Sequence, residues 1–117
     1  MIIQIGEYVK FYYERGRKHY PVIEKRAYFK EDALEAVAIL QRLRVPIEGG
    51  GVFKLKGETA ETTNTTWKMN RLAYDDYEEF LDESYKMALD YINKYDDSPD
   101  YRYLFEISVP FCIREQG

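Results

Sequence analysis

Cysteine and histidine are nearly absent from this sequence, which has one residue of each, Cys112 and His19. A single cysteine excludes an internal disulfide, so we expect the protein to work in a reducing compartment. One cysteine and one histidine also cannot form the usual zinc-binding clusters of these residues. We therefore expect no metal site and no cofactor, and we place His19 in a solvated loop and Cys112 at a small buried or edge position.

Long apolar runs are missing as well. No stretch approaches the roughly 18 consecutive apolar residues of a membrane span. The first residues lack the basic start, apolar core and small-residue cleavage site of a secretory signal. These absences predict a cytoplasmic protein without membrane contact. At 117 residues, of which 45% are hydrophobic and 32% charged, the chain is expected to form one domain, residues 1–117, around its own core.

Positive charge is scarce in the second half of the chain. Residues 57–117 contain 6 Lys and Arg against 14 Asp and Glu, whereas residues 1–56 contain 11 against 7. The acidic excess is concentrated in residues 74–97, with nine acids and two lysines. Such an asymmetry attracts a basic partner to one side of a protein and repels nucleic acid. We therefore expect no nucleic acid partner on the acidic half.

Two helices are predicted from the sequence pattern. Residues Lys30–Arg44 begin with acids and end with bases, as the helix dipole favours, and Val45-Pro46 ends the helix. In a longer helix from about Asp76 to Tyr95, Asp76 and Glu79 have the spacing of a capping box. Residues repeating at steps of three and four along this second helix are predicted to face the core. They are Tyr77, Leu81, Ser84, Tyr85, Ala88, Ile92 and Tyr95.

Three segments are predicted to be strands. Val52–Lys56 and Ala60–Trp67 flank Gly57-Glu58 as a hairpin, and Tyr103–Val109 alternates apolar and polar residues. The run Gly49-Gly50-Gly51 before the hairpin is interpreted as a sharp turn or bulge, because glycine adopts backbone angles closed to other residues. A phosphate loop is disfavoured there, since a strand follows the glycines instead of a helix.

The fold class follows from this order of elements. Residues 5–15 are predicted to form a short amphipathic helix, and the alternative is an initial strand at Ile2–Ile5. With the other elements, this predicts an α+β fold. The expected architecture is an antiparallel sheet of about three strands with two or three helices packed on one face.

The outward face of the second helix provides the candidate site. If Tyr77 and Ala88 point inward, then Glu79, Asp82, Glu83 and Asp90 point into solvent together. Glycosidase chemistry needs two facing carboxylates, one of them shielded, so carboxylates on one solvated face do not predict catalysis. The face is either an ordinary solvated surface or a protein-binding patch.

The single tryptophan has two interpretations. Trp67 is either a core residue, because its side chain buries a large area, or an anchor in a partner's pocket, because tryptophan is enriched in binding hot spots. We carry Trp67 with the four acids as a candidate partner-binding residue.

Several of these segments together resemble the immunity protein 40 family over about residues 30–109. They are the helix Asp32–Leu43, the segment Ile47-Glu48-Gly49-Gly50-Gly51-Val52-Phe53, Trp67, the final strand and the helix bearing Tyr77, Glu78, Glu79, Phe80, Ser84, Ala88, Tyr91, Ile92 and Tyr95. In this pattern, family members often carry an aspartate where Gly51 stands here. We therefore expect no fixed functional acid in that loop. The first 29 residues have no assigned counterpart.

The resemblance implies a function. Members of the family are small bacterial proteins that neutralise a partner toxin in polymorphic toxin systems. It implies a non-catalytic inhibitor that binds its cognate toxin domain stoichiometrically, and many such toxins are basic enzymes. One alternative is a cytoplasmic interaction or scaffold domain that forms homodimers through tyrosine-rich or strand-edge surfaces. Another is an enzyme that uses carboxylates and tyrosines in a cleft.

Overall fold

The structure is a computed structural model that describes residues 5–18, 23 and 25–113. Its elements in chain order are α1 (Gly6–Arg15), β1 (Tyr28–Phe29), α2 (Lys30–Leu43), β2 (Gly49–Lys56), β3 (Thr59–Lys68), the 3₁₀ helix η1 (Arg71–Ala73), α3 (Tyr77–Asn93) and β4 (Arg102–Ser108). The predicted α+β class is confirmed. Residues 5–15 form the predicted helix, and nearly all of the alternative strand lies outside the described residues, as does His19.

The sheet in the described part of the chain has four antiparallel strands in the order β1-β4-β2-β3. The predicted hairpin and final strand are β2, β3 and β4, and Gly57 turns the hairpin with a φ of 58°. The fourth strand, β1, was not predicted, because two residues are too short to show a period. It pairs with β4 through Tyr28 and Phe29.

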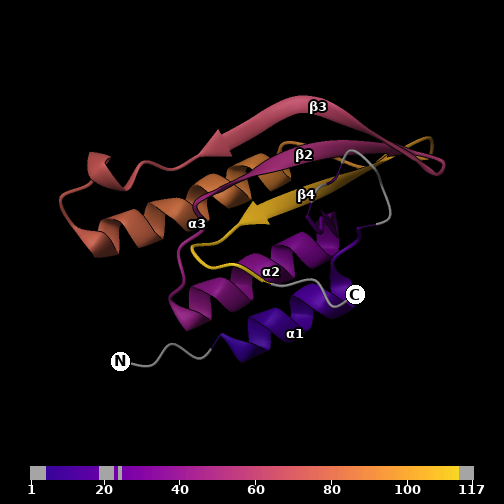
Figure 1. The fold of residues 1–117 in the computed structure, drawn as a ribbon. Helices are drawn as coiled ribbons and strands as arrows, with labels where there is room; N and C mark the ends of the chain where they lie inside the picture. Colours follow the sequence, from indigo (N-terminus) through magenta and orange to yellow (C-terminus); the bar gives the residue numbers. More distant parts are fainter. Residues whose placement is uncertain (1–4, 19–22, 24, 114–117) are drawn as a thin grey trace.

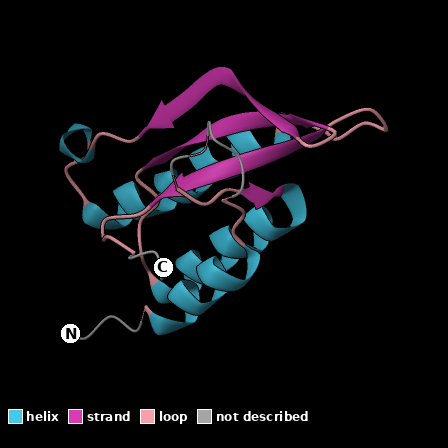
Figure 2. Cartoon of the chain, turned by 45° about the vertical axis from the view of Figure 1, so that its right-hand side comes forward, coloured by secondary structure: helices cyan, strands magenta, loops and turns pink. Residues whose placement is uncertain are grey.

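The helices lie on one side of the sheet, as expected. Figure 1 shows α2 and α3 beneath the strands, with α1 alongside α2, and the turned view in Figure 2 shows the same layering. The main core lies between these layers. Its largest fully buried side chains are aromatic and aliphatic: Tyr8, Tyr28, Tyr85, Phe105, Leu40, Ile47, Leu81 and Ile92.

The opposite face of the sheet is also partly covered. Leu104 on β4 and Leu55 on β2 pack with Ile23 and Ala27, which precede β1, in a second small apolar cluster. The alternation along β4 places Phe105 and Ile107 toward the main core. Leu104 points to the other face, where the chain before β1 buries this side chain completely.

The three consecutive glycines are not the predicted turn. They are the first residues of β2, and Gly50 is paired with Trp67 on one side and Ile107 on the other. A Cβ atom at Gly50 would clash with the Trp67 ring and with the backbone oxygen of Glu106. Glycine is therefore required by a close approach of neighbouring groups rather than by an unusual backbone angle.

The irregularity of the hairpin lies in β3 instead. The register shifts between Val52, paired with Thr65, and Phe53, paired with Thr62. Two residues of β3 between these pairs, Thr63 and Asn64, are not paired with a residue of β2 in the strand register, and Asn64 has a φ of 62°. Bulges of this kind bend the strand and increase its twist.

None of the helices in the described residues combines the length and apolar character needed to cross a bilayer.

Candidate functional site

Helix α3 carries the four predicted acids and begins at a well-defined cap. Asp76 is the N-cap, and its carboxylate accepts a hydrogen bond from the backbone N–H of Glu78 at 3.0 Å. Glu78 and Glu79 occupy the first turn, where negative charge is favoured by the helix dipole. Asp76 is therefore confirmed as the residue that caps the acidic helix, whereas the bond that it accepts comes from Glu78 and not from Glu79, as in the predicted capping box.

The buried side of α3 agrees with the predicted periodicity except at its start. Leu81, Ser84, Tyr85, Ala88 and Ile92 are all buried. A buried hydrogen-bond network ties this side to the segment before β2. The Ser84 hydroxyl accepts from the Ile47 N–H at 3.1 Å, and the Tyr85 hydroxyl donates to the Val45 carbonyl at 2.9 Å.

Tyr77 was predicted to face the core, and this is wrong. Its side chain is 45% exposed, although it lies on the same side of the helix as the buried residues. Figure 1 shows that the first turns of α3 extend past the ends of β2 and β4. Because the described strands end before the first turn of α3, a residue that is in phase with the core remains exposed there.

The structure places the four acids on the solvent side of α3. Glu79, Asp82 and Asp90 are exposed and form no ion pair with any residue that the structure describes. Glu83 is half-buried and pairs with Lys86 at 3.6 Å. At 3.6 residues per turn the four acids span about 16 Å along one side of the helix. We call these four residues the acidic face.

Trp67 is not part of this surface. It is 6% exposed, and its ring stacks on Tyr91 of α3 with centroids 4.8 Å apart and planes at 10°. The indole N–H is buried and has no hydrogen-bond partner among the described residues. The ring therefore lies between the Gly50 backbone and α3, where it supports the acidic helix from inside.

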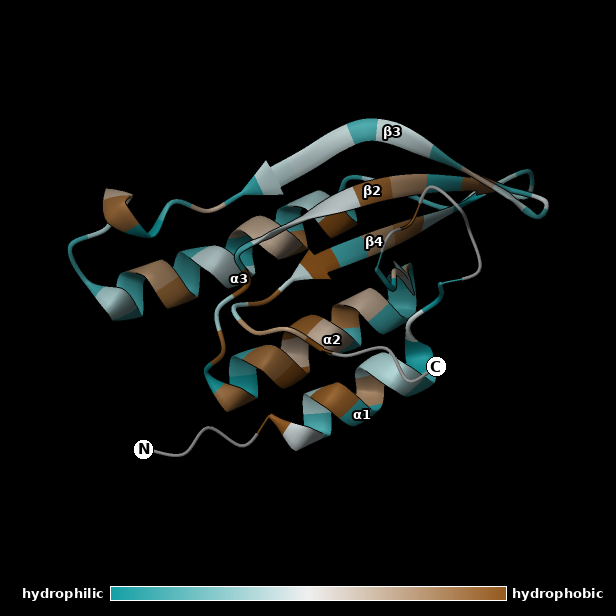
Figure 3. Cartoon of the chain, in the orientation of Figure 1, coloured by the Kyte–Doolittle hydropathy of each residue, from teal (hydrophilic) through white to brown (hydrophobic). Residues whose placement is uncertain are grey.

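Two exposed apolar residues were missed by the sequence analysis as surface features. Leu72 on η1 is 92% exposed and Tyr77 is 45% exposed. Both lie at the end of the molecule where α3 begins, and Figure 3 shows hydrophobic colour on η1 at this end. Leu72 belongs to no periodic pattern, so the sequence carried no signal for its exposure.

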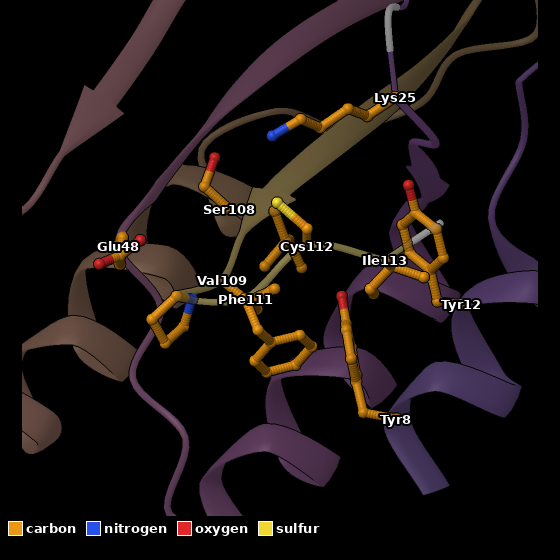
Figure 4. A pocket seen from close by; sticks show the side chains of 11 residues that line it. Tyr8, Tyr12, Lys25, Glu48, Ser108, Val109, Phe111, Cys112 and Ile113 are labelled. Atoms are coloured by element: carbon orange, nitrogen blue, oxygen red, sulfur yellow. The ribbon is translucent and has the colours of Figure 1, made fainter. Parts of the chain in front are cut away.

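A cavity of about 390 Å³ lies between α1 and the chain that follows β4. Figure 4 shows the Tyr8 and Tyr12 hydroxyls, the Lys25 amine and the Cys112 thiol around it. The Tyr8 hydroxyl accepts from Tyr28 at 2.9 Å, and burial raises the pKa of both phenols well above the ordinary value of 10.0. Both phenols therefore stay protonated at neutral pH and act as structural hydrogen-bonding groups.

The cavity does not combine two carboxylates among the described residues. Its one carboxylate among the described residues, Glu48, is exposed, so no shielded acid faces a second one there. Cys112 was placed at a buried or edge position and is exposed in the structure. Within the described residues no group of three or more His, Cys, Asp or Glu side chains is arranged to hold a metal ion.

A family of known proteins matches most of this chain. The family described as Immunity protein 40 matches residues 7–109, which run from α1 to the end of β4. The match thus begins before the region of resemblance at about residue 30 and includes α1, for which the sequence analysis had assigned no counterpart. No curated protein and no solved structure matches the chain. Because the match spans almost the whole fold, the chain belongs to the immunity protein 40 family.

Proposed function

We propose that this protein neutralises a cognate bacterial toxin domain by binding it stoichiometrically in the cytoplasm, without catalysis. The observation that carries the proposal is the family match over residues 7–109. The surface supports it, because the acids of α3 lie on an outward helix face and not inside a cleft. Such a surface suits recognition of another protein better than chemistry on a small substrate.

A growth-rescue experiment tests this function. The C-terminal toxin domain encoded next to this gene is induced with and without the protein, and complex formation is followed by size exclusion with light scattering. We expect growth to be restored in the cells that form a one-to-one complex. A toxin domain that is harmless, or that kills regardless of the protein, would contradict the proposal.

The acidic face has a defined role in this proposal. Three of its members, Glu79, Asp82 and Asp90, are exposed and not neutralised by any described cation. Long-range attraction from such a face increases the rate of encounter with a basic partner and selects against acidic ones. We therefore assign steering of a basic toxin domain to these acids. Trp67 contributes indirectly, by holding Tyr91 and α3 against the sheet.

Reversing charge on this face should slow association. In the double variant Asp82→Lys/Asp90→Lys we expect the association rate with the toxin domain to fall roughly tenfold at low salt, with a weaker dependence on salt. The dissociation rate should change little. Surface plasmon resonance at several ionic strengths measures both rates.

A matched control has the same change in net charge elsewhere. Glu35→Lys/Glu58→Lys alters two exposed acids on α2 and at the hairpin turn. If this variant slows association as much as the first, net charge and not the acidic face controls the encounter. An unchanged rate in both variants would remove steering altogether.

The main alternative is a homodimerising scaffold. Strand β3 is at the edge of the sheet, with one neighbouring strand, so its outer backbone groups are open to pairing with a second copy. The bulge at Asn64 and the charged Glu61 and Lys68 on this strand work against such pairing. Concentration-dependent dimerisation without the toxin domain would favour the scaffold.

A further inference from the structure

Two large apolar side chains are exposed among the described residues, and they lie close together in the chain. Leu72 is 92% exposed on η1, and Tyr77 is 45% exposed in the first turn of α3. Their elements, η1 and the start of α3, lie at the end of the molecule where α3 extends beyond the sheet (Figure 1). An exposed leucine alone is ordinary in a soluble protein. Leu72 differs from an ordinary exposed leucine in its surroundings, which are an ordered turn and a nearby apolar hollow.

The turn that carries Leu72 is held in place. The Asn70 side chain accepts a hydrogen bond from the Leu72 N–H at 3.1 Å, and the Arg71 guanidinium donates to the Tyr74 carbonyl at 2.7 Å. The same guanidinium lies over the ring of Tyr77, 5.4 Å from its centroid. Because the backbone is already ordered, burying Leu72 against a partner costs less conformational entropy than burying a side chain on a mobile loop.

The surface beside Tyr77 is hollowed. A cavity of about 280 Å³ is lined there mainly by apolar side chains. Tyr77 and Phe80 contribute from α3, Val45 and Pro46 from the segment before β2, and Phe111 from the chain after β4. Leu72 does not line this hollow, but Arg71, the residue before it, does, so a partner that covers both meets a projecting leucine and an apolar hollow. These are the features of the buried centre of a protein interface. We call Leu72, Tyr77 and this hollow the end surface.

Charge around the end surface has one dominant sign. The exposed residues of the segment 75–82 include five acids and no base. They are Asp75, Asp76, Glu78, Glu79 and Asp82. Arg71, which lines the hollow, donates to the Tyr74 carbonyl and lies over Tyr77 but keeps its positive charge, whereas Arg44 pairs with Glu78, so acids still outnumber bases here. A complementary partner therefore presents an apolar pocket rimmed by lysine or arginine.

We propose that the end surface is the site where the cognate toxin domain docks, with Leu72 as the anchor that enters its apolar, basic-rimmed pocket. This inference rests on the proposed function and adds to it the residues that keep the complex together. The two surfaces of the protein then have different roles in binding. The acidic face sets how fast the partner arrives, whereas Leu72 and Tyr77 set how slowly it leaves.

The test compares two substitutions in one turn. Leu72→Ser removes the anchor, and Ala73→Ser places the same polar side chain at the neighbouring exposed position. Binding to the purified toxin domain encoded by the adjacent gene is measured by surface plasmon resonance, and folding is checked by thermal unfolding. We expect the dissociation rate of Leu72→Ser to rise about 30-fold, the size of a typical hot spot. Its association rate and unfolding temperature should stay close to those of Ala73→Ser.

Each other result overturns the inference in a distinct way. If the unaltered protein binds and rescues growth while Leu72→Ser dissociates at the same slow rate, the end surface is not the docking site and the proposed function stands. If the unaltered protein neither binds nor rescues, the proposed function fails together with the inference. If Leu72→Ser instead converts a dimer of this chain into a monomer, the end surface is occupied by a second copy.

Discussion

Replacing Gly50 by alanine is expected to destabilise the fold by about 3 kcal/mol, as an overpacked core position does. Gly50 lies in a central strand between β3 and β4, and an added Cβ would clash with the Trp67 ring and the backbone oxygen of Glu106. The backbone oxygen cannot rotate away, because β4 is held in register on both sides. The indole is also fixed, since Tyr91 stacks on its other side.

Urea denaturation measures this effect, and the adjacent glycine is the matched control. A Cβ at Gly51 would lie 3.7 Å from Thr66 and 3.9 Å from Phe53, which are ordinary contacts. Gly51→Ala should therefore leave the free energy of unfolding nearly unchanged or slightly raised, because alanine restricts the unfolded chain. Equal losses in the two variants would mean that the close approach of Trp67 is not the reason for glycine at position 50.

A steep loss of stability is expected at alkaline pH. Burial raises the pKa of Tyr8 and Tyr28 far above the ordinary 10.0, and raises the pKa of Tyr85 to about 12. All three side chains are at most 2% exposed. Their phenols therefore keep their protons in the folded state under conditions where the unfolded chain loses them.

The sign of the effect follows from proton binding. Below pH 10 both states hold these protons and stability does not depend on them. Above pH 10 the unfolded state binds fewer protons, so the free energy of unfolding falls by about 1.4 kcal/mol per pH unit for each buried tyrosine. Three such groups give a slope of about 4 kcal/mol per pH unit up to about pH 12, where Tyr85 begins to ionise in the folded state.

Urea denaturation at increasing pH measures this slope. The variant Tyr28→Phe removes one of the three groups and should reduce the slope by about one third. Its loss of the hydrogen bond to Tyr8 lowers stability at neutral pH as well, so the slope and not the absolute value is compared. A slope in the unaltered protein no steeper than that of Tyr28→Phe would contradict the prediction.

The helices and most strands were predictable because their signals are local. The acids and bases at the two ends of α2, the cap at Asp76 and the turn at Gly57 all act over a few residues. Periodicity also identified most of the buried side of α3, and with it the outward direction of Glu79, Asp82 and Asp90. The position of the acidic face could therefore be predicted from the sequence.

The end surface could not be predicted from the sequence in this way. Tyr77 has the helical phase of a core residue, and its exposure depends on where the strands opposite α3 end. The hollow beside it combines residues from α3, from the segment before β2 and from the chain after β4. No local sequence pattern indicates that these three segments lie together.

The sequence by itself determined the class of fold, the start of α3 and the charge of its outer face, because propensity, capping and periodicity depend on neighbours along the chain. Only the tertiary structure decided that the glycines form a strand, that Trp67 lies over Gly50 and that Leu72 and Tyr77 are left exposed. Each of these outcomes depends on which distant segments meet and where the sheet stops. Such contacts are fixed by packing of the whole chain.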